Sequence, residues 1–371
     1  MQGLSHRAFA HFSEAHSEDS WQELAMSRQL ASRLVSLPYL PFAFIAVQCG
    51  GIMTADSGDS SADYAVPPGS MILASGQCPE HVVVDATNVY WTNGQTPCQS
   101  GGSNGSVVTC AISGCVGAPV TIASIAGGYA EGLVVDSTSV YWTTGDTVLT
   151  CPISGCGAGP TTVASGQVGA GNLAADMTDL YWTADKTIMK CAKSGCGATP
   201  TTLADGQVPS GGIAVDTSNV YWTVGYTSGG VMVCAKTGCG DTPTALATGQ
   251  GLPVDIAVDG TYVYWTTATT VMKCAASGCG GAPATLASGF VGGIGIAVDA
   301  TSVYWTTGAY GTYGTVMKCA LEGCGGSPTT VVSGSALASE VVVDSTSIYW
   351  LASTSYSPHS DDDTVMKFTP K

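Results

Sequence analysis

Basic residues are scarce in this chain of 371 residues, and no arginine follows Arg33. Beyond Cys49 the chain carries eight lysines and 23 aspartates and glutamates, and the formal net charge of the whole sequence is −16. A protein that binds a phosphate backbone needs a stripe of positive charge. Nucleic acids and anionic lipid headgroups are therefore poor partners. The acidic surface either provides solubility or attracts cations and basic partners.

Short catalytic motifs are also missing. The sequence contains no Walker phosphate loop, no His-Glu-x-x-His zinc motif and no Gly-x-Gly-x-x-Gly dinucleotide fingerprint. Beyond residue 49 no stretch shows a sustained apolar period of 3.6 residues, so helices should be few. Any site is therefore expected on irregular loops that a regular β-framework holds in place.

The chain does contain a pattern, Asp-x4-Tyr-Trp, that occurs seven times. Successive aspartates are 51, 40, 40, 43, 40 and 45 residues apart, which is the length of one four-stranded propeller blade. The aspartates are Asp85, Asp136, Asp176, Asp216, Asp259, Asp299 and Asp344. The aromatic pairs begin at Tyr90, Tyr141, Tyr181, Tyr221, Tyr264, Tyr304 and Tyr349.

The copy at residues 296–334 shows what one repeat encodes. It holds four short runs of β-branched and aromatic residues separated by turn formers, the signal of strands joined by hairpins. A lone four-stranded sheet cannot bury both faces, whereas seven sheets stacked around an axis can. The tyrosine and tryptophan of strand two point to opposite faces and should pack against the two neighbouring blades. The sequence predicts an all-β fold, a single seven-bladed β-propeller of four-stranded antiparallel blades.

The two ends of the chain predict a closed ring. The last copy stops after its third strand, Thr364–Phe368, and the missing fourth strand matches Ile72–Gln77, which precedes the first copy. The N-terminal strand should complete the last blade and remove the open sheet edge.

The segments Tyr90–Asn93, Tyr141–Thr144 and Tyr304–Thr307 resemble the YWTD repeats of low-density-lipoprotein-receptor class B propellers. The resemblance covers the whole predicted propeller at the level of the motif, and it implies a scaffold that binds partners on one face. The chain departs from that family in two ways. No copy has the fourth-position aspartate, and the family closes with six blades where seven are counted here. The family's receptor function depends on attached modules that this sequence does not show.

The 15 cysteines sort into pairs with one left over. Six pairs with Cys-x4-Cys spacing join the end of strand three to the turn before strand four, and Cys78 and Cys98 form a seventh pair. We expect disulfides formed in an oxidising compartment. Zinc, which needs four converging ligands, and reduced structural thiols are the alternatives. The six pairs are Cys110/Cys115, Cys151/Cys156, Cys191/Cys196, Cys234/Cys239, Cys274/Cys279 and Cys319/Cys324.

The N-terminal region predicts export. Residues 1–25 read as a leader or a mis-assigned start, and residues 26–48 as a signal peptide whose apolar segment is too short to span a bilayer. The end of this segment resembles a bacterial lipoprotein box, which would make Cys49 the lipidated residue. Residues 49–70 form a flexible tether to the propeller at 71–371. Plain secretion is the alternative to a lipid-anchored protein of the cell envelope.

The predicted topology sorts the connections onto two faces. The one/two and three/four turns, with the repeated aspartates and the Cys-x4-Cys pairs, share what we call the constant face. The repeated aspartates should serve as turn formers there. The two/three and four/one loops share the opposite face, the variable face, because they differ from blade to blade. Function is expected on the variable face.

Two histidines follow Cys49, and both fall on that face. His81 and His359 should come close together if the ring closes, with Glu80 and Asp361, Asp362 and Asp363 near them. This group could bind a divalent cation or supply acid and base groups to a lyase or hydrolase. No cofactor is otherwise expected.

Acidic and tyrosine side chains on the variable face make the second candidate site. Glu80, Glu131, Asp255 and Glu340 precede strand one of their blades, and Tyr226, Tyr310, Tyr313 and Tyr356 lie in the loops. Carboxylates with tyrosines suit a carbohydrate or a basic peptide. The sequence thus favours a monomeric, exported binding or scaffold protein over a propeller enzyme.

Overall fold

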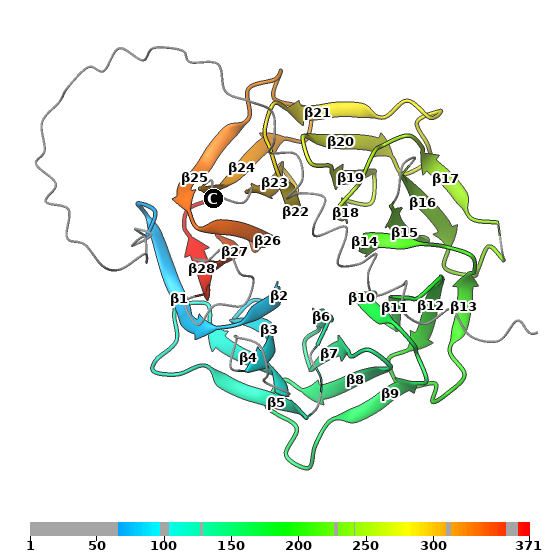
Figure 1. Ribbon diagram of the computed structural model, residues 1–371, viewed down its shortest axis with the longest axis vertical. Helices are drawn as coiled ribbons and strands as arrows, with labels where there is room; N and C mark the ends of the chain where they lie inside the picture. Colours follow the sequence, from blue (N-terminus) through cyan, green and yellow to red (C-terminus); the bar gives the residue numbers. More distant parts are fainter. Residues whose placement is uncertain are drawn as a thin grey trace, which may run out of the picture. The chain divides into compact units, whose positions relative to one another are not determined.

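A computed structural model describes residues 66–96, 104–126, 128, 130–225, 229–240, 242–308, 313–353 and 363–371. These residues belong to one compact unit, and they form 28 β-strands without a helix. The strands make seven four-stranded antiparallel sheets arranged around an axis as the blades of a β-propeller (Figure 1). The predicted fold class is confirmed. Among the described residues no helix is long and apolar enough to cross a membrane.

Each of the first six blades is built from consecutive strands, the first of which lies nearest the axis (Figure 1). Blade one comprises β2 (Pro79–Val84), β3 (Asn88–Thr96), β4 (Asn104–Ala111) and β5 (Val120–Ala126). Blade two comprises β6 (Gly132–Val135), β7 (Ser139–Thr143), β8 (Thr147–Pro152) and β9 (Thr161–Ser165). Blade three comprises β10 (Ala170–Ala175), β11 (Asp179–Ala184), β12 (Thr187–Ala192) and β13 (Thr201–Ala204).

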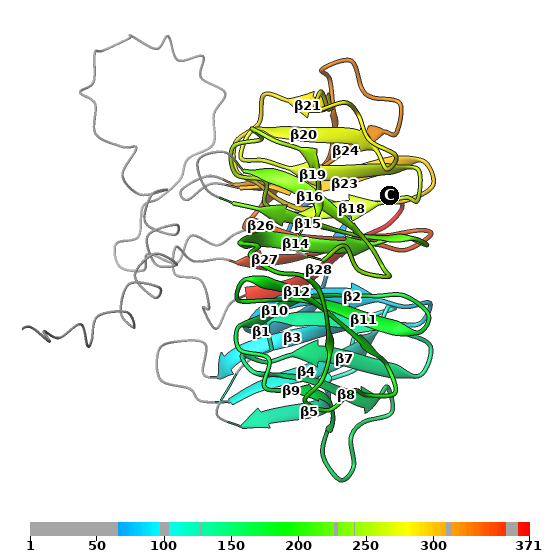
Figure 2. The same cartoon turned by 90° about the vertical axis from the view of Figure 1, so that its right-hand side faces the viewer.

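The remaining blades repeat this order. Blade four comprises β14 (Pro209–Val215), β15 (Asn219–Val224), β16 (Gly230–Ala235) and β17 (Thr244–Ala247). Blade five comprises β18 (Ile256–Val258), β19 (Tyr262–Thr266), β20 (Thr270–Ala275) and β21 (Ala284–Ser288). Blade six comprises β22 (Gly293–Val298), β23 (Ser302–Thr307), β24 (Gly314–Ala320) and β25 (Thr329–Ser335). Seen from the side, the strands run between the two loop-bearing faces (Figure 2).

Blade seven joins the two ends of the chain. It comprises β26 (Leu337–Val343), β27 (Ile348–Ser353), β28 (Asp363–Phe368) and, outermost, β1 (Ser70–Gln77). β1 pairs antiparallel with β28, with Ile72 opposite Met366 and Ala74 opposite Val365. The predicted closure by the N-terminal strand is confirmed, and it provides the geometric basis for assigning loops to the two faces.

Seven apolar clusters fill the gaps between blades. In each cluster the tyrosine of one blade packs with the tryptophan of the next, as Tyr90 does with Trp142. The last cluster pairs Tyr349 of blade seven with Trp91 of blade one and includes Leu73 of β1. All seven tryptophans of the repeats are fully buried. The expected packing of the two aromatics on opposite sides of each blade is confirmed, and it explains why the Tyr-Trp pair recurs.

The six Cys-x4-Cys pairs are disulfides, as the spacing predicts. The two cysteines of a pair are nevertheless not equivalent, a difference that the spacing alone does not show. The first cysteine lies at the end of the third strand and is buried. The second lies outside the strands, in the turn that follows, and is only half-buried because this turn emerges at the constant face. The half-buried members are Cys115, Cys156, Cys196, Cys239, Cys279 and Cys324.

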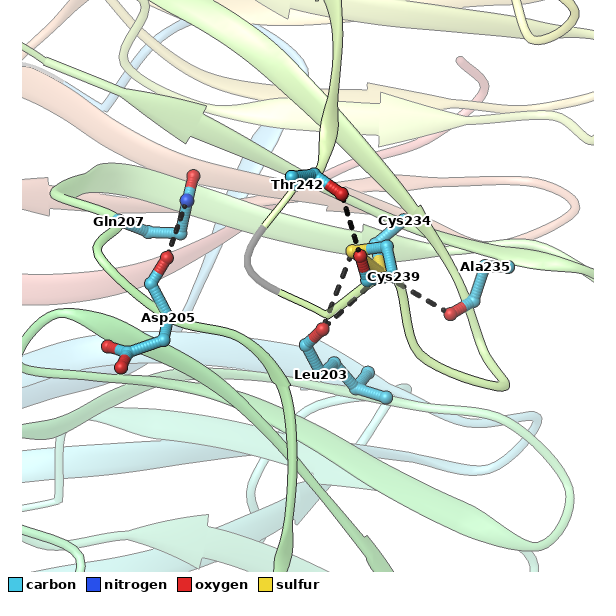
Figure 3. Close-up of a disulfide and its surroundings, with 7 residues drawn as sticks. All are labelled: Leu203, Asp205, Gln207, Cys234, Ala235, Cys239 and Thr242. Carbon is cyan, nitrogen blue, oxygen red and sulfur yellow. Dashed lines mark hydrogen bonds between the residues drawn. A yellow bond between two sulfur atoms is a disulfide. The ribbon is translucent and has the colours of Figure 1, made fainter.

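The disulfide-bonded turns also fasten neighbouring blades together. Figure 3 shows the Cys234–Cys239 bridge of blade four, whose sulfur atoms lie 3.6 and 3.4 Å from the carbonyl oxygen of Leu203 in blade three. The Cys239 N–H donates to the same oxygen at 3.3 Å. The turn therefore binds one blade to the previous one. Cys78 is buried and carries a disulfide, and its predicted partner Cys98 lies outside the described residues.

The repeated aspartates form turns as predicted. In blade three, Asp176 Oδ1 accepts the backbone N–H groups of Thr178 and Asp179 at 2.8 Å, and Oδ2 accepts the Tyr181 hydroxyl at 2.9 Å. Lys236 of blade four reaches Asp176 Oδ2 at 2.8 Å. The Asp176 carboxylate thus binds groups of the propeller itself: backbone N–H groups of its turn, the repeat tyrosine and a lysine of the next blade.

Candidate functional site

The start of each innermost strand is the place where the candidate residues gather. Counting four residues back from each repeat aspartate gives a ring position at the variable-face end of the innermost strand. Three side chains at this position, those of Asn172, Asp255 and Glu340, reach the next blade. In order of blades, the ring position holds His81, Gly132, Asn172, Gly212, Asp255, Gly295 and Glu340.

Glu340 connects the last blade to the first. Its Oε1 lies 3.0 Å from His81 Nδ1, and its Oε2 accepts the backbone N–H of Val82 at 2.5 Å. The His81 and Glu340 side chains are 23% and 29% exposed. The backbone N–H of His81 donates to Thr92 Oγ1 at 3.1 Å, which fixes the position of the strand that carries the imidazole. The contacts of Glu340 thus join blade seven to blade one at the inner rim, by which we mean the ring positions around the axis. β1 joins the two ends of the chain at the outer edge of blade seven.

Asp255 makes the equivalent link between blades five and six. One carboxylate oxygen accepts the N–H of Ile256 at 2.8 Å, and the other accepts the N–H of Ile296 in the next blade at 3.0 Å. Asn172 links blades three and four by donating from Nδ2 to the Gly211 carbonyl at 3.0 Å. Polar side chains at the ring position therefore cap backbone groups of the next innermost strand.

Glycine occupies the ring position where the next blade comes too close for a side chain. A Cβ on Gly212 would lie 2.3 Å from Asp255 Oδ1, and one on Gly295 would lie 2.9 Å from Ser339 O. The ring position thus alternates between capping side chains and glycines for steric reasons.

The electrostatics of this cluster are coupled. Burial lowers the pKa of His81, but the adjacent Glu340 carboxylate, with smaller contributions from the Glu80 and Asp255 charges, more than offsets this, so the pKa is raised. Burial raises the pKa of Asp255 to about 7, against the two backbone N–H bonds that lower it. The Glu340 charge adds to the rise. The inner rim therefore holds two groups, His81 and Asp255, whose pKa values are both raised.

The other predicted site residues occupy different places. Glu80 and Glu131 are half-buried beside the ring position, and Glu131 Oε2 lies next to Gly171 of blade three. Tyr313 is 64% exposed, whereas Asp363 is buried at the start of β28 opposite Gln77. His359, Asp361, Asp362, Tyr226, Tyr310, Tyr356 and Cys49 lie outside the described residues, as do the predicted leader, the signal peptide and most of the tether. No cluster able to hold a metal ion occurs among the described side chains.

The cysteines of the constant face take no part in this site. Half-buried Cys115, Cys156, Cys196 and Cys324 are each bonded to the buried cysteine five residues earlier in the chain. A sulfur atom in a disulfide has no thiolate to offer a metal or a substrate. These cysteines therefore contribute to the frame alone.

Sequence reasoning missed two features of the variable face. Asn172 was not identified as a member of the ring position, although aligning the repeats on their aspartates would have found it. Exposed apolar residues in the four/one loops were also missed, because a single valine in a loop carries no signal until equivalent loops are compared.

Charges are distributed unequally between the two faces. Every described lysine except Lys186 lies near the constant face, where several pair with turn aspartates, as Lys193 does with Asp136 at 2.8 Å. The loops of the variable face expose Asp146, Asp185 and Asp205. In the described loops the variable face is consequently the more acidic one.

The comparisons with known proteins agree with the fold. No protein-family model and no curated protein matches the chain. The solved WD40 β-propeller domain of Doa1 is 11% identical, covering 82% of this chain and 98% of that domain with a TM-score of 0.57. The computationally designed Ika8 protein is 12% identical, covering 77% of this chain and 82% of that protein with a TM-score of 0.52.

A third structure, described as a nidogen/laminin complex, is 18% identical over 64% of this chain and 89% of the matched chain, with a TM-score of 0.48. Likeness at such identities concerns the fold alone. The two structures with TM-scores above 0.5 support the propeller fold, and the YWTD resemblance stays a prediction from the motif.

Proposed function

We propose that this protein is an exported binding or scaffold module that recognises a protein or glycan partner through its variable face. The observation that carries the proposal is the contrast between the two faces. The constant face is occupied by repeated turns, disulfides and lysine–aspartate pairs, whereas the variable face presents irregular loops on the same rigid frame. Binding sites commonly lie on such loops.

The disulfides support export, because bridges of this kind persist in oxidising compartments. We further propose that Cys49 carries a lipid that holds the protein at the cell envelope. Metabolic labelling with a radioactive fatty acid tests the anchor. The wild type should incorporate label and sediment with membranes, and Cys49→Ser should do neither. Label retained by the Cys49→Ser protein would rule out this attachment site.

Paired substitutions on the two faces test partner binding. Asp146→Lys with Asp205→Lys alters exposed loops of the variable face, and Val116→Lys with Met177→Lys alters exposed turns of the constant face. The purified proteins are exposed to host envelope extract and to a glycan array. The proposal expects ligands retained by the wild type and the constant-face variant but lost by the variable-face variant. Loss from the constant-face variant instead would contradict it.

An enzymatic role, as a lyase or hydrolase, is favoured by one observation. Asp255, with its pKa raised to about 7, lies in the same inner-rim cluster as His81. However, the Asp255 oxygens already accept two backbone N–H groups. His81→Gln tests this role. A lyase or hydrolase would lose its activity with the imidazole, whereas a binding protein would keep its ligand.

A further inference from the structure

Four successive loops that join strand four to strand one carry an exposed apolar side chain. These residues, which we call the apolar crescent, are Val168, Val208, Leu252 and Val291 in the loops that enter blades three to six. Their exposed fractions are 74, 42, 60 and 68%. A single exposed apolar side chain is ordinary, but a row of them at matching places of neighbouring blades is not random scatter.

The loops that carry the crescent are held by their backbones. The Gln167 N–H donates to the Asp146 carbonyl and the Gln207 N–H to the Lys186 carbonyl, both at 2.8 Å, in the two/three turns of the preceding blades. On the other side, the Gly225 N–H of blade four donates to the Val208 carbonyl at 3.4 Å. Each side chain next to these bonds is therefore presented at a defined position, which lowers the entropy cost of binding.

The propeller frame does not require these apolar residues. Val168, Val208 and Val291 lie eight residues before their repeat aspartates, and Leu252 lies seven residues before its own. At the same place blades one, two and seven have Gln77, Gly128 and Ala336, the last of which is only 6% exposed. A structural requirement would recur in every blade. Because the exposed apolar residues are restricted to blades three to six, they indicate a binding surface on that arc of the ring instead.

Carboxylates flank this arc. Asp146, Asp185 and Asp205 are exposed in the loops of blades two and three, and among the described lysines only Lys186 stands beside them. Apolar contacts would provide affinity, and the carboxylates would attract and orient a positively charged partner. Valine and leucine offer no aromatic ring on which a sugar could stack, so the arc suits a polypeptide better than a glycan.

Resting on the proposed function, we propose that the apolar crescent and its flanking carboxylates dock a segment of a partner protein that combines apolar side chains with lysine or arginine. This specifies the class of partner and places it over blades three to six of the variable face.

Site-specific photo-crosslinking in the intact protein tests the inference. A photoreactive amino acid replaces Val208 in one variant and Met177 in another, because Met177 is 95% exposed on the constant face. Irradiation of host cells should give an adduct at position 208 and none at 177. Mass spectrometry should identify the attached segment as one rich in lysine or arginine and in apolar residues.

Two further variants in the position-208 background show whether the surface itself selects the partner. Val168→Thr, Leu252→Thr and Val291→Thr together should lower the adduct yield on the order of tenfold. Asp146→Asn, Asp185→Asn and Asp205→Asn together should lower it several-fold and remove its dependence on added salt. The matched control, Val116→Thr with Met177→Thr, should leave the yield unchanged, and thermal unfolding checks that every variant folds.

The outcomes separate the inference from the proposed function. An adduct at position 208 with an acidic or uncharged segment, with a glycan or with a second copy of this chain overturns the inference and leaves a binding role for the variable face. An unchanged yield in the threonine variant does the same. Adducts from position 177 alone contradict both proposals. If neither position 208 nor position 177 gives an adduct, the proposed docking surface is wrong.

Discussion

Glu340 uses both of its oxygens across the junction of the first and last blades, so single side chains there affect the whole ring. The His81 pKa is raised above its ordinary value of about 6.5. The His81–Glu340 ion pair therefore stabilises the fold fully at pH values below the ordinary histidine pKa. This stabilisation is lost as the pH rises through the pKa of His81 in the folded protein. A double-mutant cycle with His81→Gln and Glu340→Gln should give a coupling of about 1 kcal/mol at pH 6 and almost none at pH 9.

Urea unfolding at the two pH values measures this coupling. The cycle is needed because the raised pKa of Asp255 also makes stability fall as the pH rises, and the difference between variants cancels that contribution. An equal coupling at pH 6 and pH 9 would show that the neutral imidazole serves as well as the charged one.

The turn aspartates offer a matched pair at the same scale. Asp176 and Asp216 each accept two backbone N–H groups and a tyrosine hydroxyl, but Asp176 also accepts Lys236 and, at 3.2 Å, the Thr178 hydroxyl. Burial raises the Asp176 pKa, but hydrogen bonds, first that from Lys236, outweigh it and lower the pKa overall. The stabilisation is hence present at neutral pH and is lost as the pH falls below about 4.

Replacement by asparagine should be costly at both turns. Asp176→Asn should lower the free energy of unfolding at pH 7 by about 1–3 kcal/mol, and Asp216→Asn should lower it by about 1 kcal/mol less because no lysine is left unpaired. Chemical denaturation measures both. If the two substitutions cost the same, the blade-to-blade ion pair contributes nothing measurable.

At the scale of strands and hairpins, the repeat made most of the structure predictable. The Asp-x4-Tyr-Trp spacing located the blades, and strands with period-two alternation placed Tyr90 and Trp91 on opposite sides. Capping at the ring position was not predictable in this way. Whether Asp255 lines a channel or bonds the next blade depends on how two innermost strands approach each other, and no pattern within one repeat encodes that approach.

The disulfides are the elements whose contribution can be isolated most cleanly. Replacing Cys234 and Cys239 by serine should lower the free energy of unfolding by about 2 kcal/mol, because a short loop is released in the unfolded chain. Cys274→Ser with Cys279→Ser is the equivalent change in blade five and should cost a similar amount. Thermal unfolding with a reductant, which opens every disulfide, should destabilise the wild type by more than either of these paired substitutions. Unchanged stability after replacement of Cys234 and Cys239 would mean that this bridge adds nothing measurable to the folded state.

At the scale of the whole molecule, ring closure rests on β1. Leu73 and Ala74 are buried in the cluster that contains Trp91, Tyr349 and Val365, so β1 supplies core as well as an edge strand. A chain that begins at residue 78 would leave the outer edge of β28 unpaired and should lose at least about 5 kcal/mol or fail to fold cooperatively. A chain that begins at residue 66 keeps β1 and is the control.

A single substitution tests the same point without shortening the chain. Leu73→Ala should lower the free energy of unfolding by about 2–5 kcal/mol, as expected for a buried leucine in a packed core. Exposed Met71 of the same strand is the matched control, and Met71→Ala should change stability by less than about 1 kcal/mol. Hydrogen exchange should show where the loss acts. If β1 closes the ring, Leu73→Ala must speed exchange in β28 and β2, on the two sides of the junction, before it affects blades three to five. Uniform acceleration around the ring would mean that the propeller opens as one unit and that the junction of the chain ends is no weaker than any other.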